Sequence, residues 1–310
     1  MNNDVYDVII IGGAAAGLTG AIYTSREKLK TLVLEKAQCG GMTATSDLIE
    51  NYPGFPEGIN GMELIDKFKQ QAAKFGANII EFQQVRKITP EGETIKVEID
   101  KQLYSGKALI VATGSKPVKL NVPGETEFSG RGVSYCATCD GPLFKGKDLA
   151  LVGCGNSGLQ EGDHLLKFAK HITFIEFLPE MTAAKILQER LKGNQQATFL
   201  LNHALTAING QQVVESVTVK ERASGKEKVI KVGGVFIYAG FSPNSELLKG
   251  LIDLDDTGYI KTGEDMQTSR AGIYAVGDVR SKQIRQIDVA CGEATIAAIA
   301  VRDYIKKTNN

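Results

Sequence analysis

Two cysteines separated by two residues, Cys136 and Cys139, form the pair in this sequence best suited to chemistry, and Asp140 follows them directly. Thiols at positions i and i+3 can close a small disulfide, and a helix N-terminus or a hydrogen bond can make one of them a reactive thiolate. Asp140 adds a carboxyl group that can move a proton to or from the departing thiolate. Half of a zinc site is the alternative, but a structural zinc needs two further ligands, and no other cysteine is paired with a histidine at ligand spacing. The spacing therefore favours a redox-active dithiol.

A glycine-rich turn near the N-terminus lies between two apolar runs. Residues 6–11 predict a strand, the turn spans 12–17, and a helix is expected from Leu18 to about Lys28. A second buried strand over 31–34 ends in Glu35, 23 positions after the first glycine. This is the pattern of a dinucleotide-binding βαβ unit.

The turn should bind a dinucleotide pyrophosphate, because amide groups and the helix dipole favour anions at a helix N-terminus. Gly12, Ala16 and Gly17 belong to this turn, and Glu35 should accept hydrogen bonds from the adenosine ribose. Ala14 stands where a glycine usually lets the backbone approach the pyrophosphate. We therefore expect its methyl group to shift the loop slightly. A βαβ unit without a ligand is the alternative.

The same unit occurs a second time. Residues 149–152 predict a strand, 153–158 a glycine turn, and a helix is expected to about Phe168. The next strand, 172–175, ends in Glu176, again 23 positions after the first glycine. We therefore expect two dinucleotide-binding units, the second inserted within the first.

Several segments mark where the inserted unit begins and ends. A strand over 109–112 is closed by Thr113 and Gly114, and a stretch with Pro117 and Pro123 follows. Further strands are expected over 235–240 and 272–278, and an alanine-rich helix over 293–305. The predicted domains are 1–115 with 243–310, and 116–242, which contains the dithiol.

Composition sets limits on partners and location. Lys and Arg together number 36, as do Asp and Glu, so no overall field favours nucleic acid. The N-terminus does not look like a signal peptide, and no apolar run reaches membrane-spanning length. Five cysteines without a disulfide framework fit a reducing compartment. We expect a cytoplasmic protein that binds neither nucleic acid nor membrane.

Two short segments near the C-terminus have polar groups suited to a flavin. Gly277 and Asp278 follow a strand, and the carboxylate could bind a ribityl chain. Arg285 and Gln286 precede the last helix and could reach the edge of the flavin ring. By pattern alone, an Asp after Gly is usually a turn residue.

The segment 134–141, SYCATCDG, resembles the active-site segment of low-molecular-weight thioredoxin reductases. Segments 50–55, 112–114, 277–280 and 285–286 look like that family in the same order, so the resemblance covers essentially the whole chain. It implies an α/β fold with two Rossmann-like three-layer domains, the second inserted into the first, as in pyridine nucleotide-disulfide oxidoreductases. It also implies that the domain 1–115 with 243–310 binds FAD as cofactor and that 116–242 is a nicotinamide-like domain with the dithiol. Thioredoxin as partner and a homodimer are implied as well. Further FAD contacts implied by the resemblance come from Gly41, Asn51, Thr113, Gly114, Gly277, Asp278, Arg285 and Gln286.

The resemblance also implies roles for the dithiol. Cys139 would lie closer to the flavin, Cys136 would attack the disulfide of thioredoxin, and Asp140 would be the acid/base. Rotation of the inserted domain would present the dithiol first to the flavin and then to thioredoxin. The junctions near Lys116 and Ser242 should therefore be hinges.

The chain departs from NADPH-using relatives at the end of the strand 172–175. A His-Arg-Arg cluster and a further arginine bind the 2′-phosphate there, whereas this chain has Glu176, Phe177, Leu178 and Thr182. Repulsion between a carboxylate and a phosphate about 4 Å apart costs roughly 1 to 4 kcal/mol. Each lost charge-assisted hydrogen bond costs about 1.5 to 3 kcal/mol more. NADPH should therefore bind poorly.

Two electron donors are compatible with the loss of the cations that bind the 2′-phosphate. Glu176 has the geometry that binds an unphosphorylated ribose, which indicates NADH. Gly158 and Gly162 weaken the following helix, and Phe177 and Leu178 form an apolar ledge. Reductases of the clostridial type resemble this chain, and in them reduced ferredoxin feeds the flavin. We expect reduced ferredoxin as donor, with NADH as the alternative.

Other functional classes make distinct predictions. The flavin subunit of a peroxide-reducing system usually has additional N-terminal domains, whereas this chain begins at its flavin-binding strand. A redox sensor would need no substrate-facing dithiol. Cys39, next to Gly40 and Gly41, is expected near the flavin but has no resolving partner. The remaining cysteines and histidines are expected to be structural: Cys154, Cys291, His164, His171 and His203.

Overall fold

The computed structural model describes residues 5–100 and 102–308. The chain divides into two compact units, one made of 1–116 with 242–310 and the other of 117–241. The segments that pass between them, β7 (Ser115–Pro117) and β16 (Phe241–Pro243), form a two-stranded sheet. Within the described ranges, no helix is long and apolar enough to cross a membrane.

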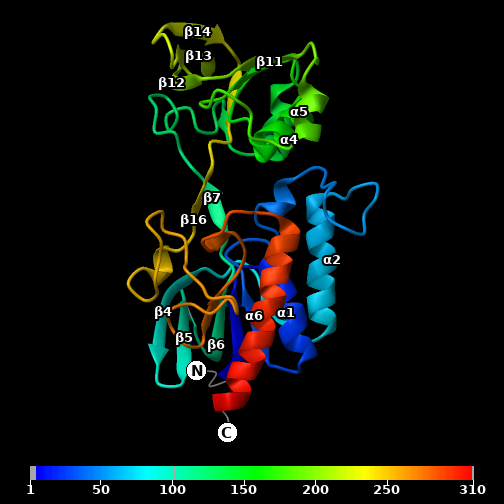
Figure 1. Cartoon of the computed structure of the whole chain (residues 1–310), viewed down its shortest axis with the longest axis vertical. Helices are drawn as coiled ribbons and strands as arrows, with labels where there is room; N and C mark the ends of the chain where they lie inside the picture. The colour runs from blue at the N-terminus through cyan, green and yellow to red at the C-terminus, as the bar shows by residue number, and fades with distance from the viewer. Residues whose placement is uncertain (1–4, 101, 309–310) are drawn as a thin grey trace. The chain divides into compact units, whose positions relative to one another are not determined.

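The first unit is built on a seven-stranded sheet (Figure 1). Its strands run in the order β3-β2-β1-β6-β5-β4, and β17 pairs with the end of β6. The neighbours β3, β2, β1, β6 and β17 are parallel, whereas β4 and β5 form an antiparallel extension. The bounds are β1 Val5–Ile11, α1 Ala15–Arg26, β2 Thr31–Leu34, α2 Gly61–Lys74, β3 Asn78–Ile80, β4 Val85–Glu91, β5 Thr94–Ile99, β6 Leu103–Val111, β17 Ile273–Ala275 and α6 Ile287–Thr308.

Strand β1 shows why the sequence builds a central parallel strand. Its residues 8–11 are all buried, because Ile9 and Ile11 face one apolar cluster while Val8 and Ile10 face another. A strand covered on both faces is a continuous apolar run rather than an alternating one. Helices α1 and α6 lie side by side against the second cluster (Figure 1).

The second unit has a five-stranded parallel sheet in the order β11-β10-β9-β15-β8. A three-stranded antiparallel sheet, β12-β13-β14, belongs to the same unit. The bounds are β8 Val133–Ser134, α3 Ala137–Asp140, β9 Asp148–Val152, α4 Asn156–Leu165, β10 His171–Ile175, α5 Lys185–Leu191, β11 Ala197–Leu200, β12 His203–Gly210, β13 Val214–Glu221, β14 Glu227–Lys231 and β15 Gly234–Ile237.

The predicted α/β fold is confirmed, while several element bounds differ from the prediction. Helix α1 begins at Ala15, three residues before the predicted start, because its first turn is part of the glycine turn. Helix α6 begins at Ile287 instead of 293, and its early residue Cys291 accepts a hydrogen bond from Thr19 on α1 at 3.3 Å. Asp278 lies in a 3-10 helix, Gly277–Val279, rather than in a strand.

Candidate active site

The two cysteines of the predicted dithiol form a disulfide. Cys136 and Cys139 are bonded through their sulfur atoms, with their Cα atoms 5.3 Å apart. Cys136 is the N-cap of the short helix α3, and its Sγ accepts a hydrogen bond from the Cys139 amide at 3.2 Å. Cys139 is exposed and Cys136 half-buried. Across the described residues, no group of three or more His, Cys, Asp or Glu side chains is arranged to hold a metal ion.

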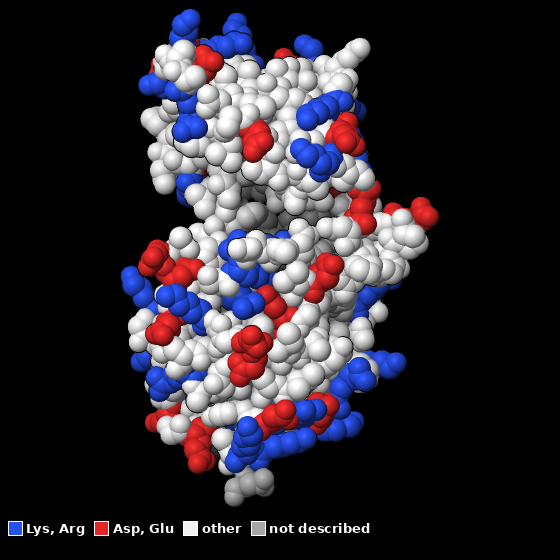
Figure 2. All heavy atoms as spheres, in the orientation of Figure 1, with Lys and Arg blue, Asp and Glu red and all other residues white. Residues whose placement is uncertain are grey.

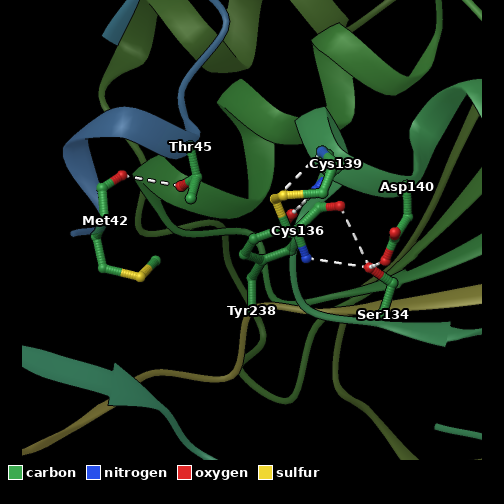
Figure 3. Close-up of a disulfide and its surroundings, with 8 residues drawn as sticks. Met42, Thr45, Ser134, Cys136, Cys139, Asp140 and Tyr238 are labelled. Atoms are coloured by element: carbon green, nitrogen blue, oxygen red, sulfur yellow. Dashed lines mark hydrogen bonds between the residues drawn. A yellow bond between two sulfur atoms is a disulfide. The ribbon is translucent and has the colours of Figure 1, made fainter. Parts of the chain in front are cut away.

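A small polar network surrounds this disulfide (Figure 3). The Ser134 hydroxyl lies 2.6 Å from Asp140 Oδ2 and 3.1 Å from the Cys136 amide nitrogen. The Tyr238 hydroxyl accepts a hydrogen bond from the Ala137 amide at 2.9 Å. Burial, helped by the negative charges of nearby carboxylates, raises the pKa of Tyr238. Tyr238 therefore stays protonated at neutral pH, and the carboxyl group of this network is that of Asp140.

The first glycine turn has the close contacts that a dinucleotide-binding turn requires. Gly12 has φ +110°, and a Cβ there would lie 2.2 Å from the Ala112 carbonyl oxygen. A Cβ at Gly17 would lie 1.8 Å from the Gly12 carbonyl oxygen, so this glycine allows the helix to approach the strand. The turn also brings Ala14 next to Gly41, because a Cβ at Gly41 would lie 3.0 Å from the Ala14 methyl group.

Glu35 is fixed by two backbone amides. Its Oε2 accepts a hydrogen bond from Gly13 at 2.7 Å, and its Oε1 accepts one from Ala37 at 3.0 Å. A carboxylate has about four acceptor positions, so lone pairs remain for ribose hydroxyls. The predicted acid is thus held beside the glycine turn by its own unit.

Other predicted FAD contacts are brought together in the same unit. Asn51 Nδ2 donates to Gln286 Oε1 at 2.9 Å, although 235 residues separate them. A Cβ at Gly277 would lie 3.1 Å from the Ala16 methyl group, which places the C-terminal 3-10 helix against α1. The Thr113 hydroxyl donates to the Asn244 carbonyl at 2.7 Å, which fixes the loop containing Gly114.

Arg285 has an unpaired hydrogen-bond donor, whereas the Asp278 carboxylate has an ion-pair partner. The Nε of Arg285 is buried without a hydrogen-bond partner, while its guanidinium lies 4.4 Å from the Tyr259 ring centroid. A buried unpaired donor at a predicted flavin-contact position fits a polar ligand there. Asp278 lies 3.4 Å from Lys282 Nζ, whose side chain is almost fully buried and also contacts Glu293 at 3.2 Å.

The second glycine turn repeats the geometry of the first. Glu176 Oε2 accepts from the Cys154 amide at 2.6 Å and Oε1 accepts from the Leu178 amide at 2.9 Å, as Glu35 does in the first unit. A Cβ at Gly158 would lie 2.0 Å from the Gly153 carbonyl oxygen, and one at Gly162 would lie 2.4 Å from the Phe174 ring. Both glycines therefore allow close packing of α4, a role that helix propensity alone does not predict.

One cation, Arg222, lies near this turn although the sequence does not predict it. The Arg222 guanidinium lies 3.8 Å from the Phe177 ring centroid, and its Nη1 donates to the Phe177 carbonyl at 3.1 Å. Arg222 follows β13 and is 45 residues away in sequence, so no local pattern signals this contact. Phe177 and Leu178 still expose 54% and 42% of their surface.

Comparison with known proteins gives consistent matches over the chain. The family model for pyridine nucleotide-disulphide oxidoreductases matches residues 6–294. A thioredoxin reductase of Bacillus subtilis (strain 168) is 41% identical over 304 residues, covering 98% of this chain and 96% of that protein. The crystal structure of Lactococcus lactis thioredoxin reductase (FR conformation) has a TM-score of 0.95 and 36% identity, covering 97% of this chain and 99% of that one. That of T. acidophilum thioredoxin reductase has a TM-score of 0.93 and 37% identity, covering 99% of both chains. Thioredoxin reductases of this family are FAD-dependent flavoproteins.

Proposed function

The chain belongs to the family of pyridine nucleotide-disulphide oxidoreductases, and we propose that it is a thioredoxin reductase. Electrons would pass through FAD and the Cys136–Cys139 dithiol to the disulfide of a thioredoxin. The observation that carries the proposal is the disulfide at the start of α3, in a chain that matches thioredoxin reductases over its length.

The residues of the first unit fit FAD. The first glycine turn, with Gly12, Ala14, Ala16 and Gly17, would hold the pyrophosphate, and Glu35 would accept from the adenosine ribose. The unpaired Nε of Arg285 offers a donor to the same ligand. When bound and reduced by the electron donor, the flavin would supply the two electrons that reduce the disulfide. The remaining FAD contacts that we propose are Gly41, Asn51, Thr113, Gly114, Gly277, Asp278 and Gln286.

The dithiol chemistry follows from the arrangement around α3. Two electrons break the sulfur–sulfur bond, and Asp140 would supply one proton, so that one sulfur leaves as a thiol and the other as a thiolate. Cys136 would then attack the thioredoxin disulfide, forming a mixed disulfide and releasing one thioredoxin thiolate. Cys139 would resolve it by attacking Cys136, which restores the disulfide and releases the second thiolate.

We propose reduced ferredoxin as the electron donor. The positions that hold cations in NADPH-using relatives are Glu176, Phe177 and Leu178 here, and Glu176 is buried. A 2′-phosphate would meet this carboxylate, which is repulsive. The exposed Phe177 and Leu178 form an apolar edge where a ribose site is usually polar. A one-electron donor needs no glycine turn, only access to the flavin.

NADH is the second candidate, and one observation favours it. Glu176 is held by the Cys154 and Leu178 amides in the same way that Glu35 is held in the first unit. If the first arrangement binds a ribose, the second has the same acceptor in place.

Three further properties belong to the proposal. The first unit would be the FAD-binding domain and the second the nicotinamide-like domain with the dithiol, joined by hinges near Lys116 and Ser242. The chain would be a homodimer, which fits Ile296 and Ile299, one turn apart on α6 and each more than two-fifths exposed. It would act in the cytoplasm, where thioredoxin-type dithiols are kept reduced. Analytical ultracentrifugation tests the dimer.

The deciding experiment offers reduced ferredoxin, NADH and NADPH in parallel to the anaerobic holoprotein and follows flavin bleaching. Fast bleaching by ferredoxin supports the proposal, and fast bleaching by NADPH contradicts the argument from the 2′-phosphate. Bleaching by NADH alone selects the second candidate. Cys136→Ser is the matched control: its flavin must still bleach, while thioredoxin reduction stops.

A further inference from the structure

A buried serine connects the disulfide to the acidic side chain that follows it. Ser134 is the last residue of β8, and its hydroxyl lies within 3.2 Å of three groups. These are the amide and the carbonyl of Cys136, at 3.1 and 3.2 Å, and Oδ2 of Asp140, at 2.6 Å. Figure 3 shows the Ser134 side chain between the Cys136 backbone and the Asp140 carboxylate.

The direction of these hydrogen bonds follows from the donors available. The Cys136 amide can only donate, so Ser134 Oγ accepts from it. The single hydroxyl proton is shared between the Cys136 carbonyl and the carboxylate, and the shorter, charge-assisted contact with Asp140 is the stronger one. The chain of bonds therefore runs from the Cys136 amide through Ser134 to Oδ2 of Asp140.

This arrangement leaves one carboxylate oxygen free. Considering the described part of the chain, Oδ1 of Asp140 has no hydrogen-bond partner, whereas Oδ2 is occupied by Ser134. Ser134 thus fixes the carboxylate through one oxygen and leaves the other available for a proton. We propose that Ser134 is a positioning residue that holds Asp140 in the orientation needed to exchange a proton with the dithiol.

The titratable groups near this network come from the elements packed around α3. Tyr238 follows β15 and donates its proton to no described group, while Glu161 on α4 and Asp140 both act on Tyr238 through their negative charge. Because Tyr238 stays protonated, the acidic group that contacts Ser134 in this network is the Asp140 carboxyl group. The inference rests on the proposed role of Asp140 as acid/base. Failure of the Ser134 role and failure of the proposed function must therefore give different results.

The test is the rate at which the chemically reduced dithiol reacts with 5,5′-dithiobis(2-nitrobenzoate). The reaction oxidises the two thiols to the disulfide, reduces the reagent to two thiolates and releases two protons. It needs neither thioredoxin nor an electron donor, so its failure is distinct from failure of the proposed function. Four proteins are compared: wild type, Ser134→Ala, Asp140→Asn and the double variant.

We expect Ser134→Ala to slow the reaction about tenfold, within the roughly 10²- to 10⁴-fold that a general acid or base contributes. In the Asp140→Asn background the same substitution should have no further effect, because the carboxylate that Ser134 orients is gone. Equal slowing in both backgrounds indicates a merely structural role and overturns the inference, as does an unchanged rate in Ser134→Ala.

A rescue variant keeps the inference testable if Ser134→Ala folds poorly. Ser134→Thr retains the hydroxyl and should react within about twofold of wild type while it stays folded. A tenfold loss in folded Ser134→Thr overturns the inference.

Discussion

Glu35 and Glu176 make the same two backbone contacts in the two units, and this allows the FAD assignment to be tested by a matched pair of substitutions. Glutamine in place of either glutamate keeps one acceptor oxygen and replaces the other by an NH₂ group. One of the two backbone amides then loses its partner, which costs about 1 to 3 kcal/mol of stability. The cost should be larger for Glu176→Gln, because Glu176 is buried and Glu35 is half-buried.

The effect on FAD should separate the two variants. Glu35→Gln removes a charged acceptor for the ribose hydroxyls, and a hydrogen bond to a charged group contributes about 1.5 to 3 kcal/mol. At 1.4 kcal/mol for each factor of ten, FAD affinity should fall roughly 10- to 150-fold. Glu176→Gln belongs to the second unit and should bind FAD with wild-type affinity.

The assay is fluorescence titration of the apoproteins with FAD, together with thermal unfolding followed by circular dichroism. The expected result is weak FAD binding for Glu35→Gln alone and a lower unfolding temperature for both variants. The reasoning is refuted if the two variants lose FAD affinity equally, or if Glu176→Gln alone releases FAD.

Three further predictions concern packing and charge. Glu125 is buried, and Tyr135→Phe removes the hydroxyl that donates to it at 2.6 Å; this should lower the free energy of unfolding by about 1.5 to 3 kcal/mol, and no change in urea unfolding would contradict it. Burial by itself would raise the pKa of Asp255, but hydrogen bonds from hydroxyl and amide donors together outweigh it and lower the pKa from 3.8 to about 2. The ionised carboxylate should therefore stabilise the folded protein above pH 3.8, and this stabilisation should be lost as the pH falls toward 2. Asp255→Asn should lower the urea midpoint at pH 7 and show a shallower acid loss than wild type, and parallel pH curves would argue against this. Gly41 has φ +53°, and a Cβ there would lie 3.0 Å from the Ala14 methyl group. Gly41→Ala should therefore weaken FAD binding, and adding Ala14→Gly should restore part of the lost affinity. Ultrafiltration, which separates free from bound flavin, measures the affinity of both variants.

The sequence predicted the elements whose signals are local. The apolar runs and glycine turns at 6–17 and 149–158 identified both βαβ units, because strand, turn and acid stand at fixed distances along the chain. The cysteine pair likewise needed only four consecutive residues to be recognised, and the disulfide confirms it.

Contacts between distant residues could not be predicted in this way. Arg222 reaches Phe177 across 45 residues, and Asn51 meets Gln286 across 235. Gly162 was interpreted from helix propensity alone, whereas its role is set by the Phe174 ring on β10, which a Cβ would meet at 2.4 Å. Propensity describes a residue by itself, and packing against a neighbouring element overrides it.

The distribution of charged side chains over the surface also could not be predicted from the sequence alone. Both signs are interspersed over the face drawn in Figure 2, in agreement with equal numbers of basic and acidic residues. A docking patch for an acidic ferredoxin would therefore be local. We predict that Lys28 and Lys30 contribute to such a patch. Replacing both with glutamate should weaken the dependence of the bleaching rate by reduced ferredoxin on ionic strength, and an unchanged dependence would contradict this.

The central claim is that electrons leave this protein through the Cys136–Cys139 dithiol to a thioredoxin. In the most direct measurement, the holoprotein is photoreduced anaerobically, so that no natural electron donor is needed. Oxidised thioredoxin is then added, and the free thiols are alkylated and counted by mass spectrometry. Wild type should convert the thioredoxin disulfide to two thiols and regain its own disulfide, whereas Cys136→Ser should leave thioredoxin oxidised. Electron transfer through the dithiol is refuted if photoreduced wild type leaves thioredoxin oxidised, or if Cys136→Ser reduces it at the wild-type rate.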